Sequence, residues 1–364
     1  MKIDAAILRE GASRPVIEPI EIEEPRADEV LVRMVATGIC HTDLDVASRP
    51  GQRPIVLGHE GAGIVDRVGP DVTMFEPGDH VILSGDSCGH CPNCLHNYPS
   101  YCVENMPRTF GALRMDGSTP LSVDGMPVFG RFFGQSSFAT YSLTGERTPV
   151  KVPKDLPLER LGPLGCGVIT GSGAVIEALK VRPGQSIAIF GTGSVGLSAV
   201  MAARLMGASR IIAVDLIPER LALAQELGAT DAINAAEADP VAAIKDITRY
   251  GANFAFNTTN APKVYGQAIA CLAHQGVSAF VTAPHGDWAP EIFPLLAGGR
   301  TLRGIIGGDA APSQFIPMLI DFYRQGRFPF DRLITFYPFE KIADAFDDIE
   351  AGRTIKPVLK MPSA

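Results

Sequence analysis

From about residue 156 onward, the chain alternates short apolar runs with longer stretches in which apolar residues recur at helical spacing. A strand buried inside a parallel sheet is apolar along its whole length, whereas a helix that covers the sheet is apolar on one face. The pattern therefore predicts an α/β fold with six strands in a doubly wound parallel sheet. The expected strands cover 187–190, 211–214, 232–234, 253–257, 276–282 and 301–306. Helices are expected at 163–179, from the glycine motif to about 206, at 218–227, after Asp239-Pro240 and at 263–273.

The first 150 residues have a different pattern, in which short β-type runs are separated by clusters of Pro, Gly and Asp. These runs cover 5–8, 17–22, 29–35, 63–68 and 80–84, and they predict a mainly β, barrel-like lobe. The last residues contain two expected helices, near 317–325 and 339–350, and form too short a segment for a domain of their own. We expect this tail to pack on the β lobe, which gives domains of 1–167 with 306–364, and 168–305.

A glycine motif follows the first strand of the α/β half, in the order strand, tight turn, helix, strand. Gly191 permits a sharp turn, Gly193 leaves room for a pyrophosphate, and Gly196 lets the helix lie close to the sheet. Ser194 and Val195 open the helix, whose free N–H groups and partial positive charge favour phosphate. This arrangement predicts a dinucleotide site.

The second strand ends in Asp215, 19 residues after Gly196. A carboxylate at this point accepts hydrogen bonds from both hydroxyls of an adenosine ribose. Its charge also repels a 2′-phosphate. The sequence therefore predicts NAD in preference to NADP.

Composition excludes several classes of protein. A chain of 364 residues with 46% hydrophobic and 20% charged residues is typical of an ordinary globular protein with two domains. Its net charge of −8 argues against nucleic acid or an anionic membrane as partner. The uncharged run 183–203 has only the minimum length for a membrane span, and its four glycines with several Ser and Thr make a poor spanning helix. Charged residues interrupt the N-terminal segment, so we expect no export signal and a cytoplasmic protein.

Four of the seven cysteines lie within fifteen residues, at Cys88, Cys91, Cys94 and Cys102. Four thiolates this close can surround one Zn²⁺ tetrahedrally and close its coordination shell, which makes the site structural. Two disulfides or free thiols are the alternatives. A reducing compartment favours zinc.

The remaining chemistry-bearing residues are spread along the chain. Cys40, His59 and Cys166 each lie in a glycine-bounded segment, and each taken alone is more often a packed residue than a ligand. Spacing alone does not join them. Cys271, in an expected apolar helix, is predicted to lie in the core.

Five motifs occur in one order: Cys40-His41-Thr42-Asp43, Gly58-His59-Glu60, the cysteine cluster, the segment 165–171 (GCGVITG), and the glycine motif with Asp215. In these motifs, and over nearly its whole length, the chain resembles the zinc-dependent medium-chain alcohol dehydrogenases. Within that family it is most similar to the aryl (benzyl) and allylic alcohol dehydrogenases. The resemblance implies a GroES-like catalytic lobe beside a Rossmann domain, with two Zn²⁺ per chain and NAD.

The resemblance also assigns residues to the reaction. It implies that Cys40, His59 and Cys166 hold a catalytic Zn²⁺ with an open fourth position, the Cys₂His set known for alcohol dehydrogenases. The metal would lower the pKa of a bound alcohol, and hydride would then pass to the nicotinamide. Thr42 matches the residue that takes the alcohol proton. Asp43 matches the carboxylate that orients the histidine ligand.

Further positions match more weakly. Glu60 matches a carboxylate beside the zinc, and Asp215 and Arg220 match the contacts to the adenosine ribose. His41 and Lys356 match positions that touch the pyrophosphate. Asp45 stands where many relatives have a histidine that continues the proton relay, so the relay beyond Thr42 is left open.

The function expected from these features is reversible oxidation of primary hydrophobic alcohols, aryl or allylic, to aldehydes. Four phenylalanines are expected to border the substrate cleft, with ordinary core packing as the alternative: Phe110, Phe132, Phe133 and Phe138. A thiol-adduct formaldehyde dehydrogenase and a small aliphatic alcohol dehydrogenase are alternatives in the same class. A non-catalytic dinucleotide-binding protein is the alternative of another class, and it would have no need of an open zinc site. The edge strand 301–306 predicts a homodimer or homotetramer.

Overall fold

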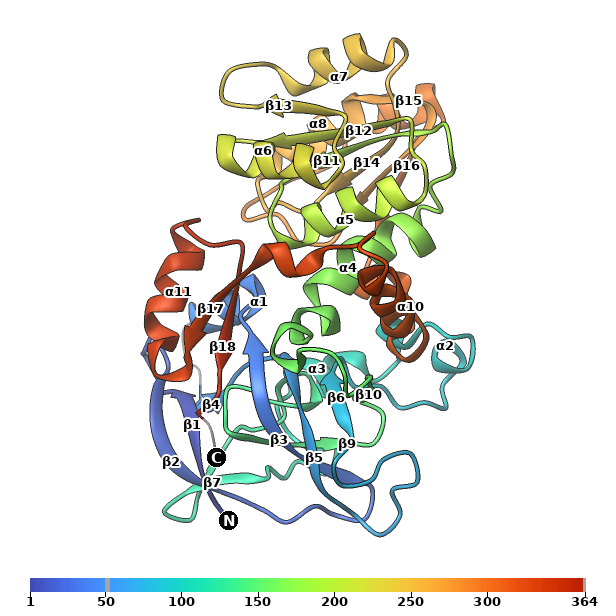
Figure 1. Ribbon diagram of the computed structural model, residues 1–364. Helices are drawn as coiled ribbons and strands as arrows, with labels where there is room; N and C mark the ends of the chain where they lie inside the picture. The colour runs from blue at the N-terminus through green and yellow to red at the C-terminus, as the bar shows by residue number, and fades with distance from the viewer. Residues whose placement is uncertain (50–52, 363–364) are drawn as a thin grey trace. The chain divides into compact units, whose positions relative to one another are not determined.

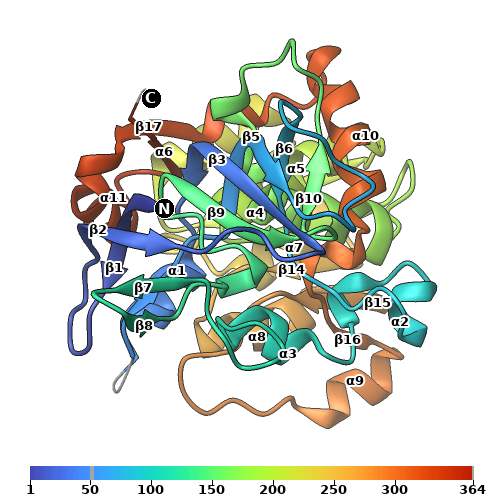
Figure 2. The ribbon, with the colours of Figure 1, turned by 90° about the horizontal axis from the view of Figure 1, so that it is seen from below.

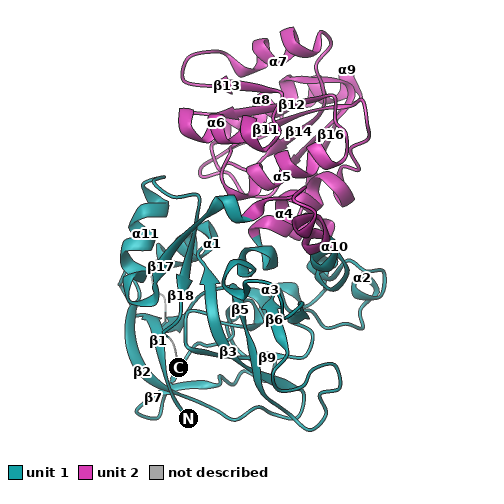
Figure 3. Ribbon diagram, viewed as in Figure 1, with its two compact units in different colours: residues 1–166, 311–318, 331–364 teal, residues 167–310, 319–330 magenta. Residues whose placement is uncertain are grey.

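The computed structural model describes residues 1–49 and 53–362. The chain forms two compact units (Figures 1 and 3). Unit 1 comprises Met1–Cys166, Ala311–Met318 and Asp331–Ala364, and unit 2 comprises Gly167–Ala310 and Leu319–Phe330. The predicted bounds, 1–167 with 306–364 and 168–305, differ from these units mainly in the tail, where 306–310 and 319–330 cluster with unit 2.

Unit 2 contains a six-stranded sheet in which every neighbouring pair is parallel. The strands, in spatial order, are β13 (Asp231–Asn234), β12 (Arg210–Asp215), β11 (Ser186–Phe190), β14 (Ala252–Asn257), β15 (Leu272–Phe280) and β16 (Thr301–Gly304). The connecting helices are α5 (Ser194–Leu205), α6 (Pro218–Leu227), α7 (Pro240–Thr248), α8 (Pro262–Ala270) and α9 (Ile292–Gly298). The chain runs outward from β11 to β13 and then returns to β14 on the other side. The predicted doubly wound sheet is confirmed, with its reversal of strand order between β11 and β14.

The long helix predicted over 163–179 is wrong. The segment is a 3₁₀ turn at Gly162–Gly165, a short helix α4 (Gly167–Gly173) and a π turn at Ala174–Ala178. Cys166 separates the first two with non-helical backbone angles, φ −140° and ψ −82°. Flanking glycines favour such a break because they weaken the helix on both sides. Cys271 lies at the end of α8 instead of inside a helix, but it is fully buried in the core as predicted.

Unit 1 is built from two mainly antiparallel sheets, as the β-rich pattern predicts. One sheet contains β4 (Ile55–Val56), β1 (Lys2–Leu8), β2 (Val16–Ile22), β7 (Leu121–Val123) and β8 (Met126–Val128). The other contains β10 (Pro149–Lys151), β6 (His80–Leu83), β5 (Glu60–Val68), β3 (Glu29–Gly38), β18 (Lys356–Lys360) and β17 (Ile334–Pro338), with β9 (Tyr141–Gly145) also paired to β3. Figure 2 shows β3 beside β5 and β9.

The C-terminal segment completes unit 1. Strand β18 pairs antiparallel with β3, so residues from the end of the chain lie beside residues from the first forty. Helix α11 (Ile342–Glu350) contributes Phe346 to the main core of this unit, where the ring lies 6.0 Å from that of Phe138. No helix in the described part of the chain is long and apolar enough to cross a membrane.

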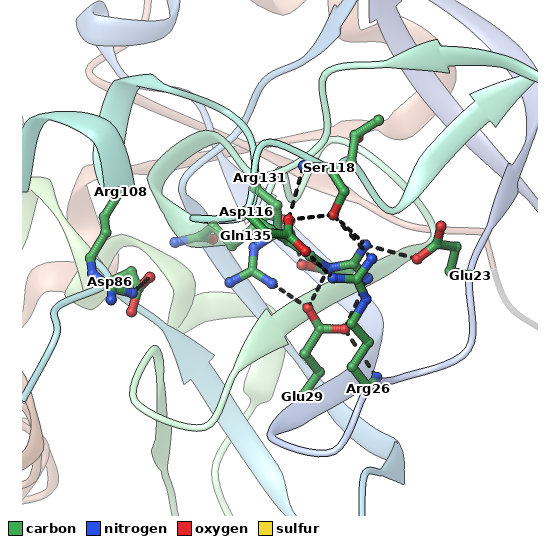
Figure 4. A network of polar contacts seen from close by, with 12 residues as sticks. Glu23, Arg26, Glu29, Asp86, Arg108, Asp116, Ser118, Arg131 and Gln135 are labelled. Atoms are coloured by element: carbon green, nitrogen blue, oxygen red, sulfur yellow. Dashed lines mark hydrogen bonds and ion pairs between the residues drawn. The ribbon is translucent and has the colours of Figure 1, made fainter.

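A buried ion network fixes the beginning of β3 (Figure 4). The Glu29 carboxylate accepts hydrogen bonds from Arg114 Nε at 2.7 Å and Nη2 at 3.0 Å, and from Arg131 Nη1 at 2.8 Å. The side chains of Glu29, Arg114 and Arg131 are all less than a tenth exposed. Burial opposes ionisation of Glu29, but the hydrogen bonds from Arg114 and from the Arg26 N–H outweigh it and lower the pKa of Glu29. The Glu29 carboxylate thus holds the segments that carry Arg114 and Arg131 against the start of β3.

We expect Glu29→Gln to lower the free energy of unfolding by about 3 kcal/mol, because it leaves two buried guanidinium groups without their shared counter-charge. The matched control is Glu24→Gln, which removes an exposed partner of Arg67 and should cost less than about 1 kcal/mol. Urea unfolding at several pH values measures both.

The pH dependence has a defined sign. A carboxylate whose pKa is lower in the folded than in the unfolded state stabilises the protein above its unfolded pKa and loses this effect as pH falls. The difference between wild type and Glu29→Gln should therefore be full at neutral pH and shrink below about pH 4. A difference that does not change with pH would contradict the ionic role of Glu29.

Candidate active site and metal centres

Three separate segments of unit 1 bring Cys40, His59 and Cys166 together. Cys40 is the N-cap of α1 (His41–Ala47), which follows β3, and His59 directly precedes β5. Cys166 lies in the break before α4. Their ligand atoms, together with a carboxylate oxygen of Glu60, all lie within 4.8 Å of one another. The structure thus joins residues that spacing alone does not connect.

Asp43 fixes the orientation of two of these segments. Its Oδ1 accepts from Gly58 N at 3.1 Å and lies 3.0 Å from His59 Nδ1, and its Oδ2 accepts from Cys40 N at 3.0 Å. Both the carboxylate and the imidazole are fully buried. A carboxylate on Nδ1 selects the tautomer with its proton there, which leaves the lone pair on Nε2.

The donor set fits a zinc ion. His59 Nε2 is buried and has no hydrogen-bond partner among the described residues. A buried polar atom without a partner is rare in folded proteins and requires an explanation. Two sulfurs and an imidazole nitrogen that converge in this way match the open Cys₂His set of catalytic zinc sites. The hydrogen bond between Cys166 and Cys40 lowers the pKa of Cys40 well below its ordinary value, against the effect of burial, and raises the pKa of Cys166.

Lys356 is predicted to contact pyrophosphate, but its side chain is buried inside unit 1. Its side chain is only 1% exposed, and Nζ donates to both oxygens of Glu60, at 2.7 and 2.9 Å, and to the carbonyl of Ile39 at 3.1 Å. The three ammonium protons are therefore directed at partners inside unit 1. Burial raises the pKa of Glu60 to about 7, against the attraction of Lys356. The lysine acts on the carboxylate beside the metal site.

The other residues of the first motif lie on α1. Thr42 Oγ1 is 3.8 Å from Cys40 Sγ, and the residue is partly exposed. His41 and Asp45 are exposed on the same helix. Their roles in proton transfer and phosphate contact stay predictions, as do the roles of Thr42 and Glu60.

Three of the four predicted phenylalanines gather at the metal site. The Phe133 ring stacks on His59 with centroids 4.3 Å apart, and Phe132 meets the imidazole edge-on at 5.6 Å. Phe110 lies edge-on to both phenylalanines. Phe138 does not belong to this cluster, because it is fully buried in the core against Phe346. Its placement at the cleft is therefore wrong.

The cysteine cluster also fits a metal. The four sulfurs, from Cys88, Cys91, Cys94 and Cys102, lie within 4.8 Å of one another. Backbone N–H groups of Cys88 and Glu104 point to Cys102 Sγ at 3.3 and 3.4 Å, and that of Cys91 points to Cys88 Sγ at 3.3 Å. All seven cysteines of the chain are free. The Cys88 and Cys94 sulfurs are 3.9 Å apart, whereas a disulfide needs about 2.05 Å. The geometry favours zinc over the disulfide alternative.

In unit 2 the glycine motif has the local geometry that a dinucleotide needs. Gly191 has φ +87°, which favours glycine. A Cβ on Gly193 would meet nothing within 4 Å, so the space beside its backbone is open. A Cβ on Gly196 would lie 1.9 Å from the Gly191 carbonyl oxygen, so only glycine fits there. Ser194 and Val195 form the first turn of α5, as predicted.

Asp215 at the end of β12 organises this loop. Its Oδ2 accepts from Thr192 N at 2.6 Å and Thr192 Oγ1 at 2.7 Å, and its Oδ1 accepts from Leu216 N at 2.7 Å. Arg220 follows in the first turn of α6 and is partly buried. The structure thus brings Asp215 to the glycine loop, and its contacts to a ribose stay a prediction.

Sequence reasoning missed three residues that shape these sites. Thr192 and Thr258 hydrogen-bond around the glycine loop, with Thr258 Oγ1 donating to the carbonyls of Phe190 and Gly191. Hydroxyl residues that directly follow strands at the motif were the available signal. Gln135, whose side chain contacts the backbone of His59, carries no such signal because it belongs to no motif.

Comparison with known proteins supports the same family throughout. Two family models match, the zinc-binding dehydrogenase model over residues 194–324 and the alcohol dehydrogenase GroES-like domain model over residues 26–154. A geraniol dehydrogenase from Castellaniella defragrans is 50% identical over 361 residues, which cover 98% of this chain and 96% of the relative.

Solved structures agree. An alcohol dehydrogenase zinc-binding domain protein from Burkholderia ambifaria is 50% identical and superposes with a TM-score of 0.97. Benzyl alcohol dehydrogenase from Acinetobacter calcoaceticus is 46% identical with a TM-score of 0.96. In both comparisons the match covers 100% of each chain. The fold predicted from the sequence is confirmed, and the chain belongs to the zinc-dependent medium-chain alcohol dehydrogenase family.

Proposed function

We propose that this protein is a zinc- and NAD-dependent alcohol dehydrogenase that interconverts primary aryl or allylic alcohols with their aldehydes. The observation that carries the proposal is the buried, unpartnered Nε2 of His59, which faces the Cys40 and Cys166 sulfurs and is oriented by Asp43. The relatives named for geraniol and benzyl alcohol support the substrate class.

The catalytic zinc, held by Cys40, His59 and Cys166, would supply a Lewis acid that lowers the pKa of the substrate hydroxyl. Asp43 keeps the imidazole in the tautomer that a metal requires. Thr42 Oγ1, beside Cys40, accepts the alcohol proton and passes it on. Asp45, one turn further along α1, is exposed and would be able to accept a proton.

The aromatic cluster supports a hydrophobic substrate. Phe133 covers one face of the His59 ring, and Phe110, which is 39% exposed, lies edge-on to Phe133, whereas Phe132 is only 1% exposed and packs in the core. An apolar wall of this kind stabilises a ring or an isoprenoid chain and excludes water. It provides no polar or charged contacts for the thiol adduct of formaldehyde, and ethanol has little apolar surface to contact it.

We further propose a second zinc in the four-cysteine site, which makes two per chain. Four thiolates leave no position for a substrate, so this ion would only stabilise its loop. Free thiols throughout the chain fit a reducing compartment, and we place the protein in the cytoplasm.

The substrate class is tested by NAD⁺ reduction with benzyl alcohol, cinnamyl alcohol, geraniol, ethanol and hydroxymethylglutathione. We expect kcat/KM for the first three to exceed that for ethanol by at least about a hundredfold, since each buried methylene adds about 0.8 kcal/mol. Preference for ethanol or the glutathione adduct would support one of the alternatives. No NAD⁺ reduction with any of the five alcohols, by protein that contains zinc, would contradict the proposed activity.

The same assay has a matched pair of variants. Thr42→Val removes the proton acceptor and should lower kcat with the best alcohol by about 10² or more, whereas Thr42→Ser keeps the hydroxyl and should retain most of kcat. Equal losses in both variants would remove Thr42 from the proton path.

Asp215 is expected to select NAD. Asp215→Ser should lower kcat/KM for NAD⁺ by about 10- to 100-fold, because it removes charge-assisted hydrogen bonds to the ribose hydroxyls. The same change should raise the relative use of NADP⁺, since no carboxylate then repels its phosphate. Glu219→Gln, an exposed charge change in the next helix, is the control and should leave the NAD⁺/NADP⁺ ratio unchanged. An unchanged ratio in Asp215→Ser would contradict the assignment.

We propose that two chains associate through unit 2. Strand β16 is an edge of the parallel sheet, and the adjoining helix α9 exposes Phe293 and Leu296 by about three quarters. An unpaired edge strand beside exposed apolar side chains favours pairing across a two-fold axis.

We expect the double variant Phe293→Glu/Leu296→Glu to sediment as a smaller species than wild type in analytical ultracentrifugation. Met126→Glu, which changes an equally exposed apolar residue on β8, is the control and should keep the wild-type mass. A wild-type mass of one chain would exclude the association.

A further inference from the structure

Gln135 is a buried amide whose hydrogen bonds all go to backbone near the metal site. It is 1% exposed and directly follows the 3₁₀ turn Phe132–Gly134. Its Nε2 donates to the carbonyl oxygens of His59 at 3.1 Å and Ser84 at 3.0 Å, and its Oε1 accepts from Gly61 N at 3.2 Å. Both N–H groups of the amide and its oxygen are therefore in use.

Ser84 continues this chain of hydrogen bonds toward Cys166. It directly follows β6, is 4% exposed, and donates from Oγ to the carbonyl of Gly165 at 2.9 Å. Gly165 is the residue before Cys166, and its Cα lies so near the Leu83 carbonyl that a Cβ would be 2.2 Å from that oxygen. The segment that carries Cys166 is thus held against the end of β6.

Two separate sets of hydrogen bonds connect the three predicted metal ligands. Asp43 connects His59 to Cys40, whereas Gln135 and Ser84 connect His59 to Cys166. His59 and Cys166 are 107 positions apart in the chain, so their separation depends on tertiary contacts of this kind.

We propose that Gln135, through Ser84, is a positioning residue that sets the distance between His59 and Cys166 and thereby the retention and geometry of the catalytic metal. The inference rests on the proposed assignment of Cys40, His59 and Cys166 as ligands. The side chain must be an amide of this length. A glutamate in its place would put a carboxylate against two carbonyl oxygens, and an apolar side chain would leave three buried backbone groups without partners.

The experiment measures metal release from purified holoenzyme to an excess of chelator, in wild type and in Gln135→Glu, Gln135→Met and Ser84→Ala. Two sites should give two phases of metal release. The phase that is lost in Cys166→Ser is assigned to the catalytic site. Residues that orient metal ligands affect metal affinity by about 10- to 100-fold. We therefore expect the catalytic phase to be about tenfold or more faster in both Gln135 variants, with the four-cysteine phase unchanged.

A second readout is the visible spectrum of protein whose catalytic metal has been replaced by Co²⁺, which reports ligand geometry. The Gln135 variants should shift this spectrum. Ser84→Ala should change both readouts in the same direction but by less. Because Gln135 and Ser84 act in one chain of hydrogen bonds, adding Ser84→Ala to Gln135→Met should change little beyond Gln135→Met alone. Ser84→Ala also serves as the test if either Gln135 variant fails to fold.

The control is Ser186→Ala, which removes a buried hydroxyl bonded to Asn253 in unit 2. It should leave the catalytic phase and the Co²⁺ spectrum unchanged even if the melting temperature falls. Equal acceleration of both phases, or a wild-type catalytic phase in Ser84→Ala and the folded Gln135 variants, would overturn the positioning role. Only one release phase in wild type, or two in Cys166→Ser, would instead contradict the ligand assignment.

Discussion

The buried carboxylate of Asp43 is the constraint on which the active site depends. Asp43 is the third residue of α1, and its acceptance of the Cys40 N–H forms part of a capping box at the start of that helix. The other oxygen of the same carboxylate orients His59 and holds the Gly58 N–H. A buried carboxylate is costly unless its oxygens are satisfied. Asp43 therefore couples the start of α1 to the alignment of Cys40 and His59, two of the residues predicted to bind metal.

Two other carboxylates follow the same physical rule in different parts of the molecule. Glu29 is held by two arginines at the start of β3, and Asp215 by backbone and hydroxyl donors of the glycine loop. Glu29 joins segments 85 and 102 positions away, whereas Asp215 joins two ends of one local unit, 23 positions apart. Asp215 accepts four hydrogen bonds, from Thr192 N, Thr192 Oγ1, Leu216 N and Ile217 N, and a carboxylate offers about four acceptor positions. The predicted ribose would therefore have to share carboxylate oxygens that the loop already holds, and its contacts stay a prediction.

How much of this could be predicted depends on how far apart the interacting residues lie. The glycine loop and Asp215 belong to one continuous strand–turn–helix–strand unit, so local pattern was sufficient for both. The helix expected at 163–179 failed because its apolar periodicity hides the break at Cys166, where tertiary contacts to Ser84 and β6 fix the backbone. Phe138 resembled its three neighbours in sequence, but only the fold shows that it faces α11 instead of His59. Gln135 belongs to no sequence motif, and its partners are backbone groups of His59, Gly61 and Ser84, 51 to 76 positions away in the chain.

Lys356 gives the last segment of the chain an electrostatic role in unit 1. Strand β18 pairs with β3 so that Val358 lies opposite Gly38, and Gly38 in turn lies opposite Glu60 on β5. This register places the Lys356 ammonium on the Glu60 carboxylate. Without that cation, the site would hold the charge of Glu60 beside the Cys40 and Cys166 sulfurs in a buried position. With it, the charge of Glu60 is offset within the protein, so that Cys40 and Cys166 would be left to neutralise a divalent metal. The C-terminal segment of unit 1 thus supplies the counter-charge of a buried carboxylate as well as core residues such as Phe346 and Leu359.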